Sequence, residues 1–220
     1  MTDEPAKPTK NTERTIGIIT IVGFVLLLAM GVWFYQASNT AIEREYFTYN
    51  SIPFSPADSG VGFIFEFYLN DAQFPTLMSI REDPRTLEDI PIDPSYVKEI
   101  ILDATNVYVT IEPSDELRGA TTVAAKEIDY FIDNNHLYNI PVNSSFMSPT
   151  EESQLSLEEQ TIKTCEDSHD GTLVIWLRLG EETAVFEEEG CLVVQGASPN
   201  EMEIIRAADR LVLTLLGIMR

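Results

Sequence analysis

The chain has 220 residues, of which 36 are acidic and 14 are basic, so its formal net charge at neutral pH is −22. Residues 1–14 hold three acidic and three basic side chains, and the negative excess therefore falls on the remainder of the chain. Nucleic-acid binding depends on Lys and Arg side chains that neutralise phosphates, so this charge excludes nucleic acid as a partner class.

The first predicted element is a membrane anchor, because the stretch Ile16–Tyr35 is apolar and contains no charged residue. A helix of this length matches the ~30 Å hydrocarbon core of a bilayer. Aromatic side chains at positions 33–35 stand where a signal-peptide cleavage site needs small residues, so a retained anchor is favoured over a cleaved signal. We expect a cytoplasmic tail over residues 1–14 and a transmembrane helix over residues 15–36, with lipid contact through residues 16–35.

Basic residues near the two ends of this helix predict its orientation. Lys7, Lys10 and Arg14 precede the helix, whereas Arg44 is the first basic residue after it. Basic residues close to a membrane segment favour the cytoplasmic side. The chain is therefore expected to be a single-pass protein of the cell membrane with a cytoplasmic N-terminus and an extracytoplasmic C-terminal domain.

Residues 37–60 are expected to form a spacer, because Pro53 and Pro56 oppose regular secondary structure. Residues 61–220 are long enough for one domain with its own core. Strand-like and helix-like segments alternate along this domain, which predicts the α/β or α+β class.

The predicted domain begins with an antiparallel hairpin of the segments 63–69 and 74–80, which are rich in aromatic and apolar residues. The following segment, residues 81–94, combines prolines with charged residues. It is expected to be an ordered loop that contains one helical turn.

Two strand-then-helix units follow. A strand over Val107–Ile111, an apolar helical pattern from residue 117 to residue 131 and a strand at Ile140–Val142 predict a βαβ crossover. The last part of the chain has three predicted strands, at Leu173–Leu179, Thr183–Phe186 and Cys191–Gln195. Turns are expected at Asp170-Gly171 and Glu189-Gly190.

The C-terminal helix has a clear predicted start, because Ser198 is a capping residue, Pro199 suits the first helical position and Glu201 follows three residues after the cap. Its apolar face is predicted to be core and consists of Ile204, Ile205, Ala208, Leu211, Val212, Leu215 and Leu216. The opposite face is predicted to meet solvent and consists of Glu203, Arg206, Asp209 and Arg210. The units together predict a two-layer sandwich with a mixed sheet and two main helices.

Cys165 and Cys191 are the only cysteines, and a pair on an extracytoplasmic side favours a disulfide over free thiols. The alternative is a metal site, because Cys165, Asp167 and His169 offer thiolate, carboxylate and imidazole within a short segment. Their spacing matches no established metal motif. We therefore expect no metal and no cofactor, with these three residues as the candidates if a metal binds.

Arg81 and Arg85 stand beside prolines in an acidic domain. They predict either a structural role in the Pro84 loop or a contact with an anionic ligand or partner, and the structural role is favoured. Asn143 begins an N-x-S sequon, which is a glycosylation acceptor on an extracytoplasmic surface.

Catalytic residues are not expected. Adjacent carboxylates such as Glu88 and Asp89 point to opposite faces in a strand and are typical of solvated surface. The chain has two histidines and no nucleophile-elbow pattern, so a serine nucleophile lacks its usual partners.

The segments Asp83–Ile92, Ala207–Leu211 and Leu216–Met219, with the helix after Pro113, resemble those of a group of archaeal single-pass membrane proteins. The resemblance implies a location in the archaeal cell envelope and agrees with the strand–helix units. No activity is known for that group, so the resemblance implies none.

The favoured function is a non-enzymatic, membrane-anchored extracytoplasmic domain that binds another envelope or surface protein or has a structural role in the envelope. The alternatives are a membrane-tethered enzyme or metal-dependent module that uses the Cys165–His169 segment, and a domain that binds a small anion at Arg81 and Arg85.

Overall fold

The computed structural model describes residues 46–68, 75–113, 117, 119–151, 156 and 158–220, together with residues 23, 26–28, 30 and 31. The chain divides into two compact units, Met1–Arg44 and Glu45–Arg220. In the first unit the described residues are helical and exposed to solvent. Most of the predicted anchor lies outside the described residues, and the helices within them do not reach the length and hydropathy that a membrane span requires.

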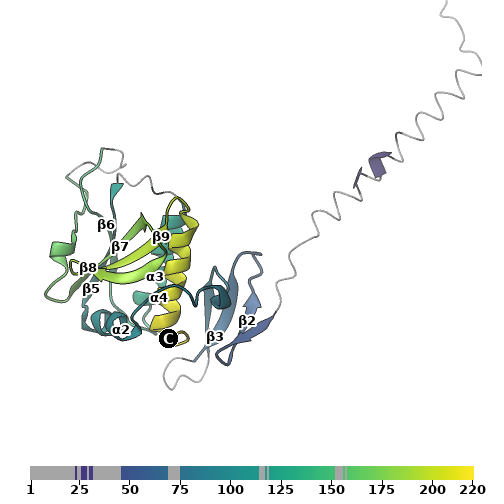
Figure 1. The fold of residues 1–220 in the computed structure, drawn as a ribbon, viewed down its shortest axis with the longest axis horizontal. Helices are drawn as coiled ribbons and strands as arrows, with labels where there is room; N and C mark the ends of the chain where they lie inside the picture. Colours follow the sequence, from purple (N-terminus) through teal and green to yellow (C-terminus); the bar gives the residue numbers. More distant parts are fainter. Residues whose placement is uncertain are drawn as a thin grey trace, which may run out of the picture. The chain divides into compact units, whose positions relative to one another are not determined.

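The second unit begins with a four-stranded antiparallel sheet, counted over the described residues, in the order β1-β2-β3-β4 (Figure 1). Its strands are β1 (Phe47–Tyr49), β2 (Ile52–Pro56), β3 (Phe63–Phe67) and β4 (Thr76–Ile80). The predicted hairpin is confirmed, because β3 and β4 pair antiparallel and Phe65 lies opposite Met78.

The expectation that prolines stop regular structure before this hairpin is wrong, because Pro53 and Pro56 both lie within β2. Phe54, between them, packs on Phe47 and Phe65 with ring centroids 5.3 and 4.9 Å apart. Packing of these three aromatic rings, of which Phe54 and Phe65 are buried, offsets the hydrogen bonds that proline cannot donate to a strand ladder.

A second, five-stranded sheet within the described residues has the order β6-β5-β7-β9-β8. Its strands are β5 (Asn106–Ile111), β6 (Val142–Phe146), β7 (Thr172–Gly180), β8 (Ala184–Glu188) and β9 (Cys191–Ala197). The strands β6, β5, β7 and β9 run parallel, and β8 is antiparallel to β9. The predicted mixed sheet is confirmed, and the βαβ crossover is present, but its second strand is β6 and not the expected segment Ile140–Val142. Glu189 and Gly190 form the β8–β9 turn with positive φ angles of 51° and 92°.

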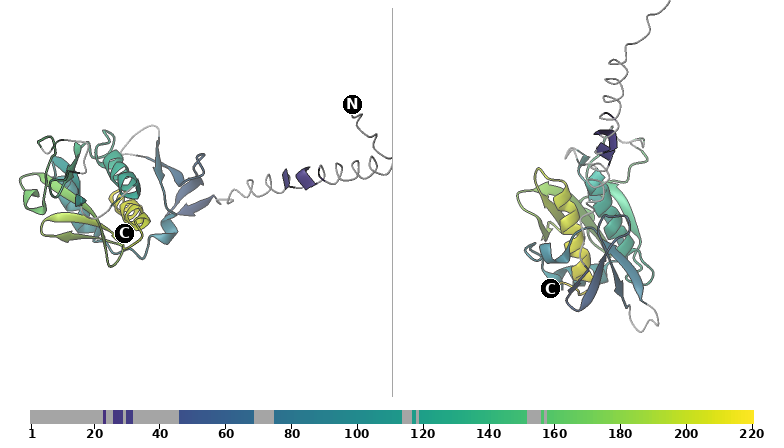
Figure 2. Two further views of the ribbon diagram at one scale, coloured as in Figure 1. Left: turned by 90° about the horizontal axis from the view of Figure 1, so that it is seen from above. Right: turned by 90° about the vertical axis from the view of Figure 1, so that its right-hand side faces the viewer.

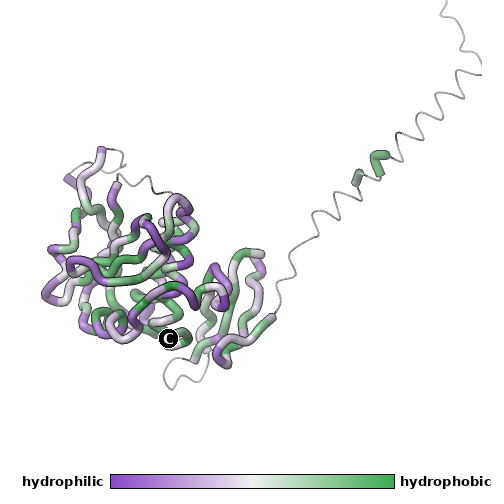
Figure 3. The backbone as a smooth tube through the Cα atoms, viewed as in Figure 1, coloured by the Kyte–Doolittle hydropathy of each residue, from purple (hydrophilic) through white to green (hydrophobic). Residues whose placement is uncertain are grey.

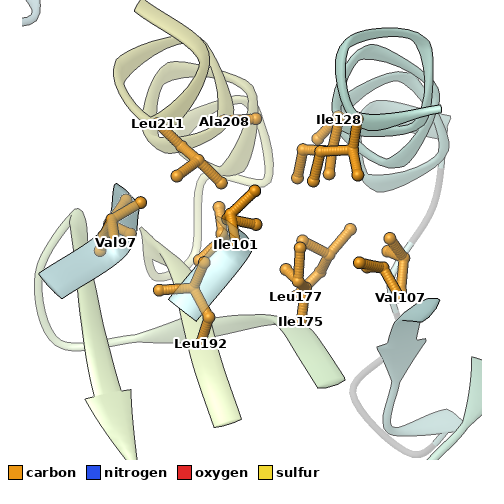
Figure 4. Close-up of a cluster of buried hydrophobic side chains, with 14 of the residues drawn as sticks. Val97, Ile101, Val107, Ile128, Ile175, Leu177, Leu192, Ala208 and Leu211 are labelled. Atoms are coloured by element: carbon orange, nitrogen blue, oxygen red, sulfur yellow. The ribbon is translucent and has the colours of Figure 1, made fainter. Parts of the chain in front are cut away.

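The helices α2 (Pro94–Asp103), α3 (Gly119–Ile132) and α4 (Met202–Leu215) pack on one face of the five-stranded sheet. Figure 4 shows the core that they share, in which Leu211 and Ile128 point toward Ile175, Leu177 and Leu192. Figure 3 shows hydrophobic residues along the central strands. The helical turn expected in the loop before α2 is present as η1 (Pro84–Thr86).

The prediction of a two-layer sandwich is incomplete, because the four-stranded sheet adds a third layer. Phe131 of α3 and Val212 and Leu213 of α4 form one buried cluster with Phe54, Phe65 and Met78. The helices therefore lie between the two sheets, as Figure 2 shows. A helix enclosed in this way needs apolar contacts on two sides.

The expected solvent face of the last helix is wrong for two of its four residues. Asp209 is 1% exposed and Arg210 is 5% exposed. The four-stranded sheet and the segment after it cover this side of α4, so its polar residues are buried with backbone partners. Arg210 Nε, for example, donates to the carbonyl oxygen of Ile90 at 3.2 Å.

The predicted start of the same helix is also wrong, because α4 begins at Met202. Ser198 N–H still donates to the carbonyl oxygen of Gly180, which extends the pairing of β7 with β9. Glu201 directs its carboxylate to another helix, where Oε1 accepts from the backbone N–H and the hydroxyl of Thr121 at 2.9 and 2.7 Å. The N-terminus of α3 thus receives its acceptor from the segment before α4.

Candidate functional site

The predicted disulfide is present, joining Cys165 in η3 (Cys165–Asp167) to Cys191 at the start of β9 with a Cα–Cα distance of 4.9 Å. Both cysteines are buried, with Val174 and Val193 beside them. A disulfide sulfur is not a thiolate, so the proposed metal site at this segment loses its strongest ligand.

The other two candidate metal ligands have partners within the chain. Asp167 accepts from Thr164 N–H at 2.9 Å and from Lys163 Nζ at 3.1 Å, and the hydrogen bond from Thr164 lowers its pKa. His169 Nδ1 lies 3.1 Å from Asp170 Oδ2 at the exposed turn. Across the described parts of the chain, His, Cys, Asp and Glu do not gather in a metal-binding group of three.

Arg81 and Arg85 do not converge on one anion site. Arg81 Nε donates to Glu127 Oε1 at 2.8 Å, and Arg85 binds the carboxylate of Asp83 and lies 3.9 Å from the ring centre of Phe47. Partial burial raises the pKa of Asp83, but the hydrogen bonds from Arg85 outweigh it and hold that pKa below its ordinary value. Each guanidinium therefore has a carboxylate partner in the chain.

Asn143 of the sequon lies on β6 and is exposed. Its Nδ2 donates to Asn106 Oδ1 on β5 at 2.9 Å. The side-chain amide of Asn143, which a glycan would modify, therefore lies on an outer strand of the sheet.

A partly apolar groove lies between α3 and β6 and has a volume of about 480 Å³. Its walls include Val142, Ser144 and Phe146 of β6 and Ala125, Lys126 and Asp129 of α3. Alternate strand residues share one face of a sheet, and helix residues three and four apart share one face of a helix. The groove is therefore built by two regular elements.

The groove exists because β6 is the outer strand of its sheet. The chain leaves β6, passes around the sheet and returns as β7 on the far side of β5, so β6 gains a second neighbour at one point only. At that point Phe146 N–H donates to Thr161 O and Lys163 N–H donates to Phe146 O, both at 2.9 Å. The small side chain of Ala125 leaves the space above the strand open.

The charged residues at the rim of the groove have partners. Lys126 Nζ lies 3.6 Å from Asp129 Oδ2. Glu159 Oε2 accepts from the backbone N–H and the hydroxyl of Ser156 at 3.1 and 2.7 Å, and these bonds lower its pKa. The groove therefore offers an apolar floor and an acidic rim.

A second hollow lies on the sheet face away from the helices and is lined by Trp176, Arg178 and Phe186. Arg178 lies 4.5 Å from the ring centre of Trp176 and makes a bidentate ion pair with Glu188. Its Nε also donates to Gln195 Oε1 at 2.9 Å. Because this arginine is committed to partners in the chain, the groove beside β6 is the better candidate site.

A buried carboxyl pair links α3, α4 and the segment after β4. Asp209 Oδ2 accepts from the backbone N–H groups of Arg81 and Glu82 at 2.9 and 2.7 Å. Asp209 Oδ1 and Glu127 Oε2 are buried and have no N–H donor among the described residues. The two carboxyl groups interact electrostatically, and a proton shared between them would give both buried oxygens a hydrogen-bond partner.

The environment of this pair moves both pKa values upward. Burial, followed by repulsion from Glu127, raises the pKa of Asp209 well above its ordinary value. Burial also raises the pKa of Glu127, against the effect of its bond to Arg81. Sequence reasoning missed this pair, because Asp209 was assigned to the solvent side of its helix.

The chain was compared with family models, curated proteins and solved structures, and none of the three comparisons gave a match. The implied archaeal envelope location therefore stays a prediction. The groove, the edge of β6 and the disulfide supply the basis for a functional proposal.

Proposed function

We propose that this chain is a single-pass membrane protein of the cell envelope whose Glu45–Arg220 unit binds another envelope or surface protein through the groove beside β6. The groove is the observation that carries the proposal. It combines about 480 Å³ of concave space with an apolar floor from a strand and a helix. Concave apolar surface with a few fixed polar groups is the usual form of a recognition site.

Two further features support the cellular location in this proposal. The apolar stretch of residues 16–35 suits a membrane anchor. The Cys165–Cys191 disulfide suits an oxidising compartment, where such bonds persist. Anchor and disulfide together favour an extracytoplasmic location for the second unit.

The groove favours binding over catalysis because its charged side chains are satisfied within the chain. Lys126 pairs with Asp129, and Glu159 accepts from Ser156. What the groove presents to a partner is apolar surface and strand backbone. The net charge of −22 favours a partner whose contact surface is basic, because charge complementarity speeds association and limits wrong partners.

Site-specific photo-crosslinking in intact membranes tests the proposal with the full-length chain. A benzophenone amino acid replaces Ala125 in the groove, and the control replaces Leu102, which is exposed on α2 and does not line the groove. We expect a discrete adduct from position 125 with an identifiable envelope or surface protein. Equal adducts from both positions, or an adduct from position 102 alone, would refute the groove as the binding site.

The membrane location has its own test. Alkaline carbonate extraction of cell membranes should leave the full-length chain in the pellet and release a variant that lacks residues 15–36. Protease added to sealed right-side-out vesicles should digest the second unit only if it lies outside. Release of the full-length chain by carbonate would contradict the anchor.

A further inference from the structure

The outer edge of β6 has backbone N–H and C=O groups of which only some are hydrogen-bonded within the described residues. Phe146 directs its N–H and C=O outward, because they bond to Thr161 and Lys163. Pro141 O and Met147 N–H bond inward to β5. Backbone groups alternate in direction along a strand, so Val142 and Ser144 also direct their N–H and C=O outward.

These outward groups of Val142 and Ser144 have no hydrogen-bond partner among the described residues. Ser144 is exposed and Val142 is half-buried. A row of unpaired backbone groups on an edge strand is a template for another strand. The same edge of β6 already pairs with the chain at one point, where Ile162 lies beside Phe146 in parallel orientation.

The unpaired edge and the groove are two sides of the same strand. The side chains of Val142, Ser144 and Phe146 face the groove, while their backbone groups face outward along the edge. A strand added to this edge would continue the sheet beneath α3. Alternate side chains of that strand would then enter the groove, as the two-residue period of a strand requires.

We propose, resting on the binding function of the groove, that the partner contributes an extended segment that adds to β6 as a further strand. Backbone hydrogen bonds to Val142 and Ser144 give the affinity, and apolar side chains in the groove give the specificity. The free edge over residues 142–145 is ~13 Å long, which corresponds to a segment of about four residues.

The acidic character of the chain favours a basic segment. Asp129 and Glu159 are acidic, and the low pKa of Glu159 keeps it ionised at neutral pH. Lys126 is already paired with Asp129. Residues between those that enter the groove point to the opposite face of the sheet, where the net charge of −22 favours basic side chains. The structure therefore assigns a segment with apolar residues at alternate positions and basic residues between them.

Fluorescence anisotropy of the full-length chain in detergent micelles tests the assignment. The probe is a labelled short peptide in which valine and lysine alternate, and the control peptide has the same composition with its valines in one block. Both are titrated at about 0.15 M salt, where long-range attraction to the acidic surface is screened. We expect saturable binding of the alternating peptide and at least about tenfold weaker binding of the control.

Two modifications then separate strand addition from simple occupation of the groove. Methylation of alternate peptide nitrogens removes the N–H groups of one edge, so one of the two alternating sets should weaken binding by about tenfold while the other leaves it unchanged. Ser144→Pro removes an outward N–H of β6 and should weaken binding similarly. Proline is tolerated at such edge positions, and the peptide modifications leave the protein itself unaltered.

The outcomes distinguish the two proposals. Ala125→Glu places a charge in the groove and tests whether the peptide occupies it. If this variant abolishes peptide binding while Ser144→Pro and both methylated peptides leave it unchanged, strand addition is overturned and the groove remains the binding site. Absence of saturable binding up to about 1 mM also overturns strand addition. In that case the crosslinking result alone decides the proposed function. A peptide-independent dimer that Ser144→Pro dissolves would assign the edge to a second copy of this chain and overturn the partner class.

Discussion

A proton shared between Asp209 and Glu127 leads to a specific prediction for Asp209→Asn. Asparagine has the shape of a protonated aspartate, so its Oδ1 can accept from the N–H groups of Arg81 and Glu82 while its Nδ2 donates to Glu127. The variant therefore keeps the hydrogen bonds of residue 209 and removes the titration of its carboxyl group. We expect it to fold and to gain stability relative to the wild type as pH rises.

The direction follows from proton linkage. Burial raises the pKa of folded Asp209 well above the value of about 3.9 in an unfolded chain, so the folded state binds more protons between these two values. The stabilising contribution is complete below the unfolded pKa and is lost as pH rises through the folded pKa. Across this window the wild type loses about 1.4 kcal/mol of unfolding free energy per pH unit relative to the variant.

Urea unfolding followed by the fluorescence of Trp176 measures this difference from about pH 5 to about pH 8, above the sequence pI of ≈ 4.2. Asp83→Asn is the matched control. The pKa of Asp83 is lowered, so its contribution changes only below its ordinary pKa and its curve should parallel the wild type. A constant loss of stability in Asp209→Asn across this range would show that Asp209 is ionised and would refute the shared proton.

Three further predictions concern the framework around the groove. Replacing Cys165 and Cys191 with Ala should lower the unfolding free energy by about 3 kcal/mol, because the bond closes a loop with a sequence separation of 26, and an unchanged thermal midpoint would contradict this. Phe131→Ala should cost about 3–5 kcal/mol in urea unfolding, because this side chain is fully buried between α3 and the four-stranded sheet, whereas the exposed Tyr130→Ala should cost under about 1 kcal/mol. Glu201→Ala should cost about 1–2 kcal/mol and speed amide exchange at the start of α3, and unchanged exchange there would exclude the cap at Thr121.

Local patterns were sufficient to predict the strands that carry their own signal. The strands β5, β7 and β9 are runs of β-branched and aliphatic residues, as buried parallel strands require. The disulfide followed from a single pair of cysteines in a domain expected to be extracytoplasmic. The helix α2 was missed although a signal was present, because Asp93 precedes Pro94 and caps the N–H groups of Ser95 and Tyr96.

The burial of polar residues on α4 depends on the four-stranded sheet, so the local sequence pattern could not predict it. A polar residue at a helix position has the same periodicity whether it meets solvent or a buried partner, so Asp209 and Arg210 looked like surface residues. Their burial follows from the four-stranded sheet, which packs on the opposite side of α4. The partner groups are main-chain atoms more than a hundred residues away in sequence.

The groove depends on strand order, which the sequence does not contain. Val142 and Phe146 read as core residues of any strand. They line a groove only because β6 is the outer strand and the chain places β7 on the other side of β5. The unpaired edge at Ser144 is a property of this order and has no local sequence signal.

The segment that leaves the four-stranded sheet is fastened along its length by the last helix. Arg206 Nη2 donates to Thr86 O at 2.5 Å, Asp209 accepts from Arg81 N–H, and Arg210 donates to Ile90 O. These hydrogen bonds join the segment that follows the four-stranded sheet to α4, which is synthesised later. During synthesis the four-stranded sheet can therefore complete its contacts with the helices only after α4 has been made, and we expect part of its aromatic face to stay exposed until then. A nascent chain stalled before Met202 should for this reason bind chaperones through its N-terminal strands.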